Sequence, residues 1–197
     1  LNLGTVTVGQ NFSATSGGVI SDSGVITVAG TGTFITDVND IDIVLDSDNA
    51  ITGALTFTTQ TSGSTNGADI TFDNGSTAIS LAAFVTEGDL TLKTDAAIAL
   101  TGHNVQGDLS VTSAGAITQS AALTVSGTSS FTSTGTNTNI TLSTDSNALT
   151  GAVSASTTGS SGDLTIDNGT TALNLGTLTA NGDLSIRGGN GITDSGV

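Results

Sequence analysis

The 197-residue sequence lacks proline, cysteine, methionine, tryptophan and tyrosine, and lysine, arginine and histidine together contribute three side chains. Catalysis by nucleophilic attack or proton transfer usually recruits cysteine, histidine, lysine, tyrosine or carboxylates with shifted pKa values. Outside serine, threonine and aspartate, the candidates are His103, Lys93, Arg187 and Glu87. This shortage argues against an enzyme, and the sequence indicates no catalytic, cofactor-binding or metal-binding residue with a recognisable motif.

The sequence has almost no positive charge, and its formal net charge is −15. Nucleic acid and anionic membrane surfaces are therefore excluded as expected partners, because both are bound through lysine and arginine. No apolar stretch approaches the roughly 20 residues of a membrane helix. The chain is nevertheless 36% hydrophobic, which predicts a folded protein rather than a disordered acidic segment.

The first residues, Leu1-Asn2-Leu3-Gly4, have neither the basic start nor the apolar core of a signal peptide. We therefore expect a mature interior fragment of a longer protein. The absence of cysteine removes disulfides as a source of stability and leaves the redox compartment undetermined.

Internal repeats dominate the sequence. Residues 1–25 align with residues 173–197 without a gap, with thirteen of the 25 positions identical. At an offset of 97, residues 18–45 align with 115–142, and at an offset of 94, residues 69–92 align with 163–186. We expect one β-solenoid over residues 1–197, made of two related repeats (1–97 and 98–197) and belonging to a longer repeat array.

A shorter period lies beneath these repeats. The tripeptide Gly88-Asp89-Leu90 recurs at residues 107–109 and 182–184. Apolar positions that we interpret as equivalent, mostly 19 to 22 residues apart, are Phe12, Phe34, Leu55, Leu90, Leu109, Phe131, Val153 and Leu184. This is the length of one solenoid coil, and the two longer intervals predict loops that protrude at Gln60–Gly67 and Thr157–Ser161.

Within each coil, short alternating segments such as Leu90-Thr91-Leu92 are bounded by Gly, Asn, Asp or Ser. Alternation of apolar and polar residues predicts half-buried strands, and the small polar residues predict turns. The absence of proline fits, because every internal strand must donate its amides to the next coil, about 4.8 Å away. We therefore predict an all-β parallel β-helix with three short strands per coil and a rod on the order of 45 Å long.

The run from Gly107 to Ser120, followed by residues 122–128 (ALTVSGT), resembles the repeats of filamentous-haemagglutinin-like proteins. Residues 147–153 (NALTGAV) and 171–176 (TALNLG) resemble linking segments of those bacterial exoproteins. The resemblance covers nearly the whole chain. It implies a right-handed parallel β-helix, export by two-partner secretion or as an autotransporter passenger, and a role in adhesion, cell contact or biofilm structure. It supplies no binding site.

Two site hypotheses use carboxylates. Calcium is a candidate ligand of the densest cluster, because Ca²⁺ favours several oxygen ligands; this cluster comprises Asp37, Asn39, Asp40, Asp42, Asp46, Asp48 and Asn49. Its spacing matches neither an EF-hand nor a calcium-binding β-roll, and alternation would place Asp40 and Asp42 on a solvated strand face around buried Ile41 and Ile43. Glycoside hydrolysis would need paired carboxylates in a cleft, but the sequence offers no tryptophan or tyrosine as a sugar platform.

The remaining polar candidates have structural interpretations. His103 lies in a Thr-Gly-His-Asn segment and is expected to be an exposed turn residue. Lys93 and Arg187 occupy equivalent repeat positions and are expected to pair with nearby aspartates. The segments 73–75 and 167–169, both Asp-Asn-Gly, predict tight turns because Asn and Gly tolerate positive φ.

Two functions fit the sequence. The first is a structural, non-enzymatic rod in a secreted or cell-surface adhesin, which holds binding regions away from the cell and meets a host-cell or matrix ligand. The second is a subunit of an extracellular filament or sheath that assembles head to tail. Both place the chain outside the cell, and in both the expected partners are neighbouring repeats or subunits stacked end to end.

Overall fold

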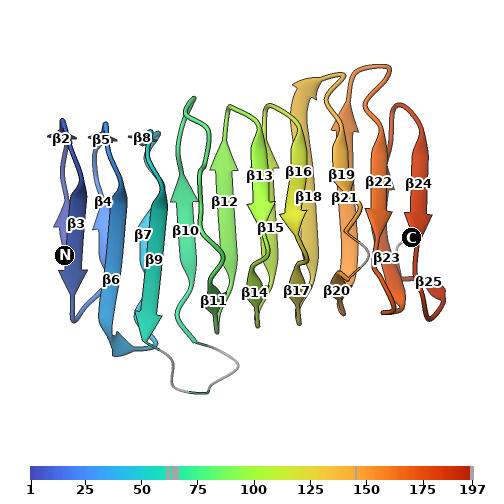
Figure 1. Cartoon of the computed structure of the whole chain (residues 1–197), viewed down its shortest axis with the longest axis horizontal. Coiled ribbons are helices and arrows are strands. Elements are labelled where there is room, and N and C mark those ends of the chain that lie inside the picture. The colour runs from blue at the N-terminus through green and yellow to red at the C-terminus, as the bar shows by residue number, and fades with distance from the viewer. Residues whose placement is uncertain (61–62, 64–66, 145, 196–197) are drawn as a thin grey trace.

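The computed structural model describes residues 1–60, 63, 67–144 and 146–195, and every regular element in that part of the chain is a β-strand. Strands pair in parallel with strands of the neighbouring coils, and about nine coils of roughly 20 residues stack into a rod. Figure 1 shows the first and last coils at opposite ends of this rod. The predicted all-β parallel β-solenoid is confirmed.

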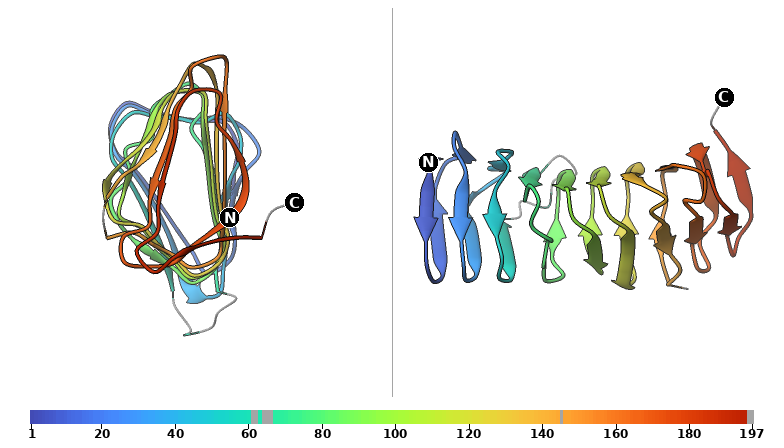
Figure 2. Two further views of the ribbon diagram at one scale, coloured as in Figure 1. Left: turned by 90° about the vertical axis from the view of Figure 1, so that its right-hand side faces the viewer. Right: turned by 90° about the horizontal axis from the view of Figure 1, so that it is seen from above.

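The cross-section is a flattened loop, visible along the rod in Figure 2. One long side, here called the first wall, is a ten-stranded sheet that runs the whole length of the rod. Its strands are β1 (Asn2–Leu3), β4 (Ile20–Asp22), β7 (Ile43–Leu45), β10 (Ile70–Asp73), β12 (Leu90–Thr94), β15 (Leu109–Ser113), β18 (Ser129–Thr136), β21 (Ala152–Thr158), β23 (Leu173–Thr179) and β25 (Ile192–Asp194).

The opposite long side, the second wall, consists of two sheets. The first has the strands β3 (Phe12–Ser16), β6 (Gly32–Asn39) and β9 (Leu55–Gln60). The second has the strands β13 (Ile98–Thr101), β16 (Ile117–Ala121), β19 (Ile140–Leu142), β22 (Leu164–Asp167) and β24 (Leu184–Arg187). Residues 79–81 join the two sheets through the isolated bridges Leu55–Leu81 and Ile79–Ile98.

Short strands close the coil at its two ends. The upper corner in Figure 1 has β2 (Val6–Val8), β5 (Ile26–Val28) and β8 (Ala50–Ile51). The lower corner has β11 (Val85–Thr86), β14 (Asn104–Val105), β17 (Thr124–Val125) and β20 (Ala148–Leu149). The early coils thus carry their corner strand at the upper end, and the later coils carry it at the lower end.

This change of side explains how the sequence repeats map onto the rod. Ile20 of the first wall aligns with Ile117 at the 97-residue offset, but Ile117 lies in the second wall, four and a half coils later. Asn2 aligns with Asn174 at the 172-residue offset, and both lie in the first wall, eight coils apart. Residues related by the 97-residue offset therefore lie half a turn apart about the rod axis. Residues related by the 172-residue offset lie on the same side of the rod.

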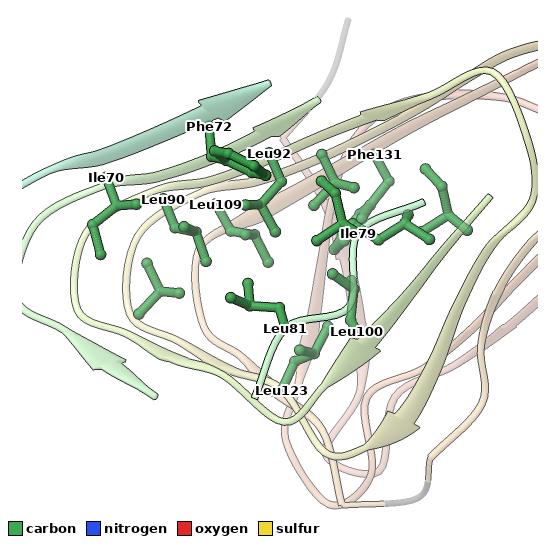
Figure 3. Close-up of a cluster of buried hydrophobic side chains, with 14 of the residues drawn as sticks. Ile70, Phe72, Ile79, Leu81, Leu90, Leu92, Leu100, Leu109, Leu123 and Phe131 are labelled. Carbon is green, nitrogen blue, oxygen red and sulfur yellow. The ribbon is translucent and has the colours of Figure 1, made fainter. Parts of the chain in front are cut away.

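The interior is a continuous aliphatic and aromatic core, because alternate residues of every strand point into the coil. Figure 3 shows Leu90, Leu92 and Leu109 packed side by side with Ile70 and Phe72 of the preceding coil. Aromatic rings also contact one another from coil to coil, with centroid separations of 5.8 Å for the tilted pair Phe12–Phe34 and 5.7 Å for the stacked pair Phe34–Phe57. Burial of this apolar area, worth about 25 cal/mol per Å², is the main stabilising contribution.

The predicted coil length is confirmed, but the predicted equivalence of individual residues is wrong in several coils. Leu109 pairs with Ser129, and Phe131 pairs with Val111. Leu184 pairs with Leu164 in the second wall, opposite the first-wall position of Leu90. Long wall strands such as β12, β15 and β18 offer three inward positions, each two residues from the next, so the apolar pattern fixes which side chains point inward but not which of them are stacked.

The loop predictions have a mixed outcome. Within the predicted loop Gln60–Gly67, residues 61–62 and 64–66 lie outside the described residues, and Gln60 is the last residue of β9. The prediction for Thr157–Ser161 is wrong at its start, because Thr157 is buried within β21 and donates a hydrogen bond to the carbonyl of Gly162. Only Gly159–Ser161 are exposed.

Candidate functional site

The recurring Gly-Asp-Leu tripeptide forms a column at the coil corner, because each aspartate caps the coil that follows it. The Oδ1 atom of Asp69 accepts a hydrogen bond from the backbone N–H of Asp89 at 2.7 Å, and the Oδ1 atom of Asp89 accepts one from Asp108 at 2.7 Å. Asp42 and Asp108 extend this lower-corner column in both directions. In the second half, Asn139 and Asp163 make the same bond at the upper corner, half a turn away.

The glycine of the tripeptide follows from this column. A Cβ atom on Gly88 would overlap the Oδ1 atom of Asp69 and the carbonyl oxygens of Gly67 and Ala68. Gly107 stands in the same relation to Asp89. The motif therefore encodes coil stacking rather than a ligand site, since the glycine makes room for a carboxylate that satisfies the next coil's backbone.

Stacked carboxylates repel one another, and this repulsion is visible at Asp69. Its pKa is raised by partial desolvation, which outweighs the hydrogen bond from the Asp89 amide, and the nearby charges of Asp89 and Asp42 raise it further. No group of three or more His, Asp or Glu side chains with a geometry suited to a metal ion occurs among the described residues.

Buried asparagines make a second set of polar contacts, with Asn49 and Asn74 at the upper corner and Asn147 at the lower corner. The Oδ1 atom of Asn74 accepts a hydrogen bond from the N–H of Ile51 at 2.9 Å, and its Nδ2 atom donates to the carbonyls of Ile51 and Ala78. Asn49 and Asn147 use Oδ1 in the same way toward Ile26 and Leu123. These side chains are at most 1% exposed, and they supply backbone partners at the ends of the corner strands: Ile26 begins β5, Ile51 ends β8, and Leu123 precedes β17.

The predicted Asp-Asn-Gly turns are confirmed, with Gly75 at φ 50° and Gly169 at φ 57°. Asp73 and Asp167 accept hydrogen bonds from the amides of these glycines at 2.8 and 2.9 Å. The sequence did not reveal that the asparagine between them would be fully buried.

The predicted ion pairs are also present. Lys93 lies 2.5 Å from Asp73 and 3.8 Å from Asp48, and Arg187 lies 2.8 Å from Asp167. The hydrogen bond with Asp73 raises the pKa of Lys93. At Asp167, burial alone would raise the pKa, but the hydrogen bonds from Arg187 and the Gly169 amide, together with the charge of Arg187, lower it overall. Both cations thus hold one coil to the next.

The calcium candidate does not form a single cluster. Asp37 and Asp40 lie exposed at the lower end of the coil, whereas Asp46 and Asp48 follow β7 at the upper end, so the length of β7 separates the two groups. Asp40 adopts a left-handed turn conformation, φ 58°, instead of an extended one. Ile41 is only half-buried, which corrects the strand alternation expected there.

His103 contradicts its prediction. It is 1% exposed and points into the core, with its ring centroid 4.9 Å from that of Phe84. Neither ring nitrogen has a hydrogen-bond partner, and burial lowers the pKa of His103 to about 4. The sequence signal that could have revealed this burial is the 97-residue alignment with Val6, whose partner Ile26 is a core residue.

The outer faces of the walls carry hydroxyls. On the first wall, Ser110, Ser130 and Ser154 form one aligned row, and Thr112, Thr132 and Ser156 form a second. A shallow hollow of about 270 Å³ lies over β18, β21 and β23, beside the register shift between Val153 and Ala155. Its lining contains no ionisable side chain, so it offers no acid–base pair.

With this geometry established, similarity to known proteins can be assessed. Residues 1–58, 87–156 and 161–197 match a family described as repeats of unknown function (DUF5649). The chain belongs to this repeat family. No curated protein and no solved structure matches the chain. The DUF5649 matches leave out the residues between 58 and 87, which include the coil where the corner strand changes side. Among the described residues no helix is long and apolar enough to cross a membrane.

Proposed function

We propose that this DUF5649 chain is a structural rod segment of a secreted or cell-surface adhesin, with no catalytic activity. The proposal rests on one observation: the polar and charged side chains of the protein make contacts between neighbouring coils. The carboxylates of Asp42, Asp69, Asp89 and Asp108 hold one coil to the next, as do the buried asparagines and both basic side chains. Because the carboxylate, amide and basic side chains of this protein serve to hold its coils together, the structure is suited to the role of an extended rod.

Two further features support an extracellular rod. The outer face of the first wall carries aligned rows of serine and threonine over β15, β18 and β21, which suits a long solvated surface. The resemblance of residues 107–128 to filamentous-haemagglutinin-like repeats points to export and adhesion. Nine coils at about 4.8 Å give a segment on the order of 45 Å, so tandem repeats would extend well beyond a cell envelope.

The test is surface display. Cells that display the chain in one or in two tandem copies are compared with cells that display an unfolded variant, Leu90→Asp, at matched surface density. Adhesion is measured on fibronectin, collagen and epithelial-cell monolayers. The proposal expects stronger adhesion with the folded chain and electron micrographs in which the rod lengthens by about 45 Å per copy. Equal adhesion by folded, unfolded and bare cells on all three surfaces would refute it.

A filament subunit is the second candidate, favoured by the in-phase repeat. Because residues 173–195 reproduce the first coil's sequence eight coils later, a further coil stacked on β25 would meet side chains like those that β4 presents to β7. Leu184 and Ile192 are 50% and 46% exposed at that end. Head-to-tail contacts that do not close produce fibres.

This candidate predicts concentration-dependent fibres in sedimentation and electron microscopy. Ile192→Lys should abolish them, whereas Thr193→Lys, on the same strand, serves as the matched control. A monomer at millimolar concentration, or equal assembly by both variants, would exclude the filament.

A further inference from the structure

The coil formed by residues 70–89, here called the junction coil, is the point where the stack is least continuous. The upper-corner sheet ends at β8 and the sheet of β3, β6 and β9 ends one strand later, while the lower-corner sheet begins at β11. Between β9 and β13 the second wall is held by two isolated bridges, Leu55–Leu81 and Ile79–Ile98, in place of a ladder. The first wall continues through β10 without a break.

His103 lies in the next coil, directly against the junction. The amide of Asn104 donates to the carbonyl of Phe84, and the amide of Thr124 donates to the carbonyl of His103, so Phe84, His103 and Leu123 occupy one column. The chain of aromatic contacts continues from Phe57 to Phe84, 6.2 Å apart and edge to face, and from Phe84 to the imidazole. A core position held by phenylalanine on one side and leucine on the other is thus occupied by a buried ring with two unpartnered nitrogens.

From this geometry we propose that His103 makes the junction coil an acid-sensitive joint: protonation of its buried, unpartnered imidazole opens the second wall between β9 and β13 while the first wall stays paired. An imidazolium in this column would have two N–H donors and no acceptor, which a folded core tolerates poorly. Opening the two isolated bridges releases residues 79–81, and this segment leads to Phe84, the ring packed against His103. The proposal does not depend on the adhesin role.

The charged groups around His103 do not offset this cost. In the junction coil they are Asp73, which pairs with Lys93, and Glu87 and Asp89, which follow β11; in its own coil they are Lys93, Asp95 and Asp108. On the other side, residues 109–144 contain no ionisable side chain. Burial is the cause of the lowered pKa of His103, and no charge contributes. Glu87 is buried as well and accepts a hydrogen bond from the amide of Gly63 at 2.9 Å, so it must be tested separately.

The direction of the pH effect follows from linkage. The open state binds a proton near the ordinary pKa of 6.5 and the closed state near 4, so the open state gains one proton relative to the closed state between these values. Above pH 6.5 the closed state of the joint has its full stability. Between pH 6.5 and 4, the equilibrium constant for closing falls by about tenfold for each unit of pH.

The chain has one histidine, which makes the experiment direct. The imidazole Hε1 signal is followed by NMR from pH 7.5 to 3.5, and hydrogen-exchange protection factors are measured over the same range for Ile79–Leu81, Asn104 and Thr124. The proposal expects an imidazole midpoint near pH 4 and about tenfold loss of protection per pH unit at these amides, with amides of β4 and β18 unaffected. His103→Leu and His103→Phe, which copy the two neighbours in the column, should abolish this loss.

Several results would overturn the proposal. They are an imidazole midpoint near 6.5 in the folded chain, loss of protection spread evenly over all coils, or the same acid response in a folded His103→Leu or His103→Phe chain. An acid response abolished by Glu87→Gln would assign the joint to that carboxyl. If neither His103 variant folds, the imidazole titration and the protection factors of the unaltered chain still test the proposal.

Discussion

Asn74 and Asn168 are equivalent in the sequence repeat and fully buried, yet they cap opposite ends of the coil. Asn74 binds the backbone of Ile51 at the upper corner, and Asn168 binds that of Leu149 at the lower corner with nearly the same geometry, 2.9 and 2.8 Å. The local structure is thus conserved between the repeats while its direction is reversed.

The first prediction concerns this pair. Asn74→Ala and Asn168→Ala each leave a buried backbone N–H and carbonyl without partners, and each should destabilise the chain by about 1–3 kcal/mol. The two costs should be similar, because the contacts are the same. Unfolding in guanidinium followed by far-ultraviolet circular dichroism measures them, and Asn104→Ala, at an exposed position, is the control. A negligible cost for both would contradict the capping role.

The second prediction concerns the glycine of the Gly-Asp-Leu motif. Gly88→Ala places a methyl group against the Asp69 carboxylate and the backbone of Gly67, so we expect destabilisation of about 1–3 kcal/mol from overpacking. Gly18→Ala is the matched control, because a Cβ there meets nothing within 4 Å. The melting temperatures of the two variants test this, and equal values would show that the corner column is not tightly packed.

The same motif shows how far the sequence could predict the structure. The recurrence of Gly-Asp-Leu and the aliphatic alternation were sufficient for the coil length and the parallel stack, because both properties are local and repeat many times. They were insufficient for the stacking partner of Leu109 or the wall that Leu184 occupies, because neighbouring inward positions look alike in sequence. His103 was misassigned for a related reason: its flanking Gly and Asn are typical of a turn, whereas its column neighbours Phe84 and Leu123 are apolar.

The third prediction concerns the ion pair of Arg187 and Asp167. Arg187→Gln should raise the pKa of Asp167, because burial raises this pKa and the variant removes the hydrogen-bonded cation that, together with the Gly169 amide, lowers it. Since the folded pKa is lowered, the pair stabilises the chain above the ordinary value of 3.8 and loses this effect as pH falls through the folded pKa. Arg187 is 60% exposed, so the contribution is about 0–1 kcal/mol. Carboxyl ¹³C titration by NMR measures the shift, and an unchanged Asp167 midpoint would contradict it.

The fourth prediction concerns the gradient of stability along the rod. Leu3, Val6, Val8 and Phe12 of the first coil are only partly buried, as are Leu175, Leu178 and Ile186 near the other end. The inward apolar residues from Phe34 to Val153 are almost fully buried, apart from Phe84. Each coil is stabilised by its neighbours, so a coil with one neighbour opens more readily than a coil with two. We expect amides of β1 and β25 to exchange at least tenfold faster than amides of β12, β15 and β18 at neutral pH, where His103 is unprotonated. Association through the open strand edges would reverse this order in concentrated samples, so the measurement is made across a dilution series. Uniform protection from end to end in dilute monomer would contradict the gradient, because it would require the outer coils to be as stable as coils packed on both sides.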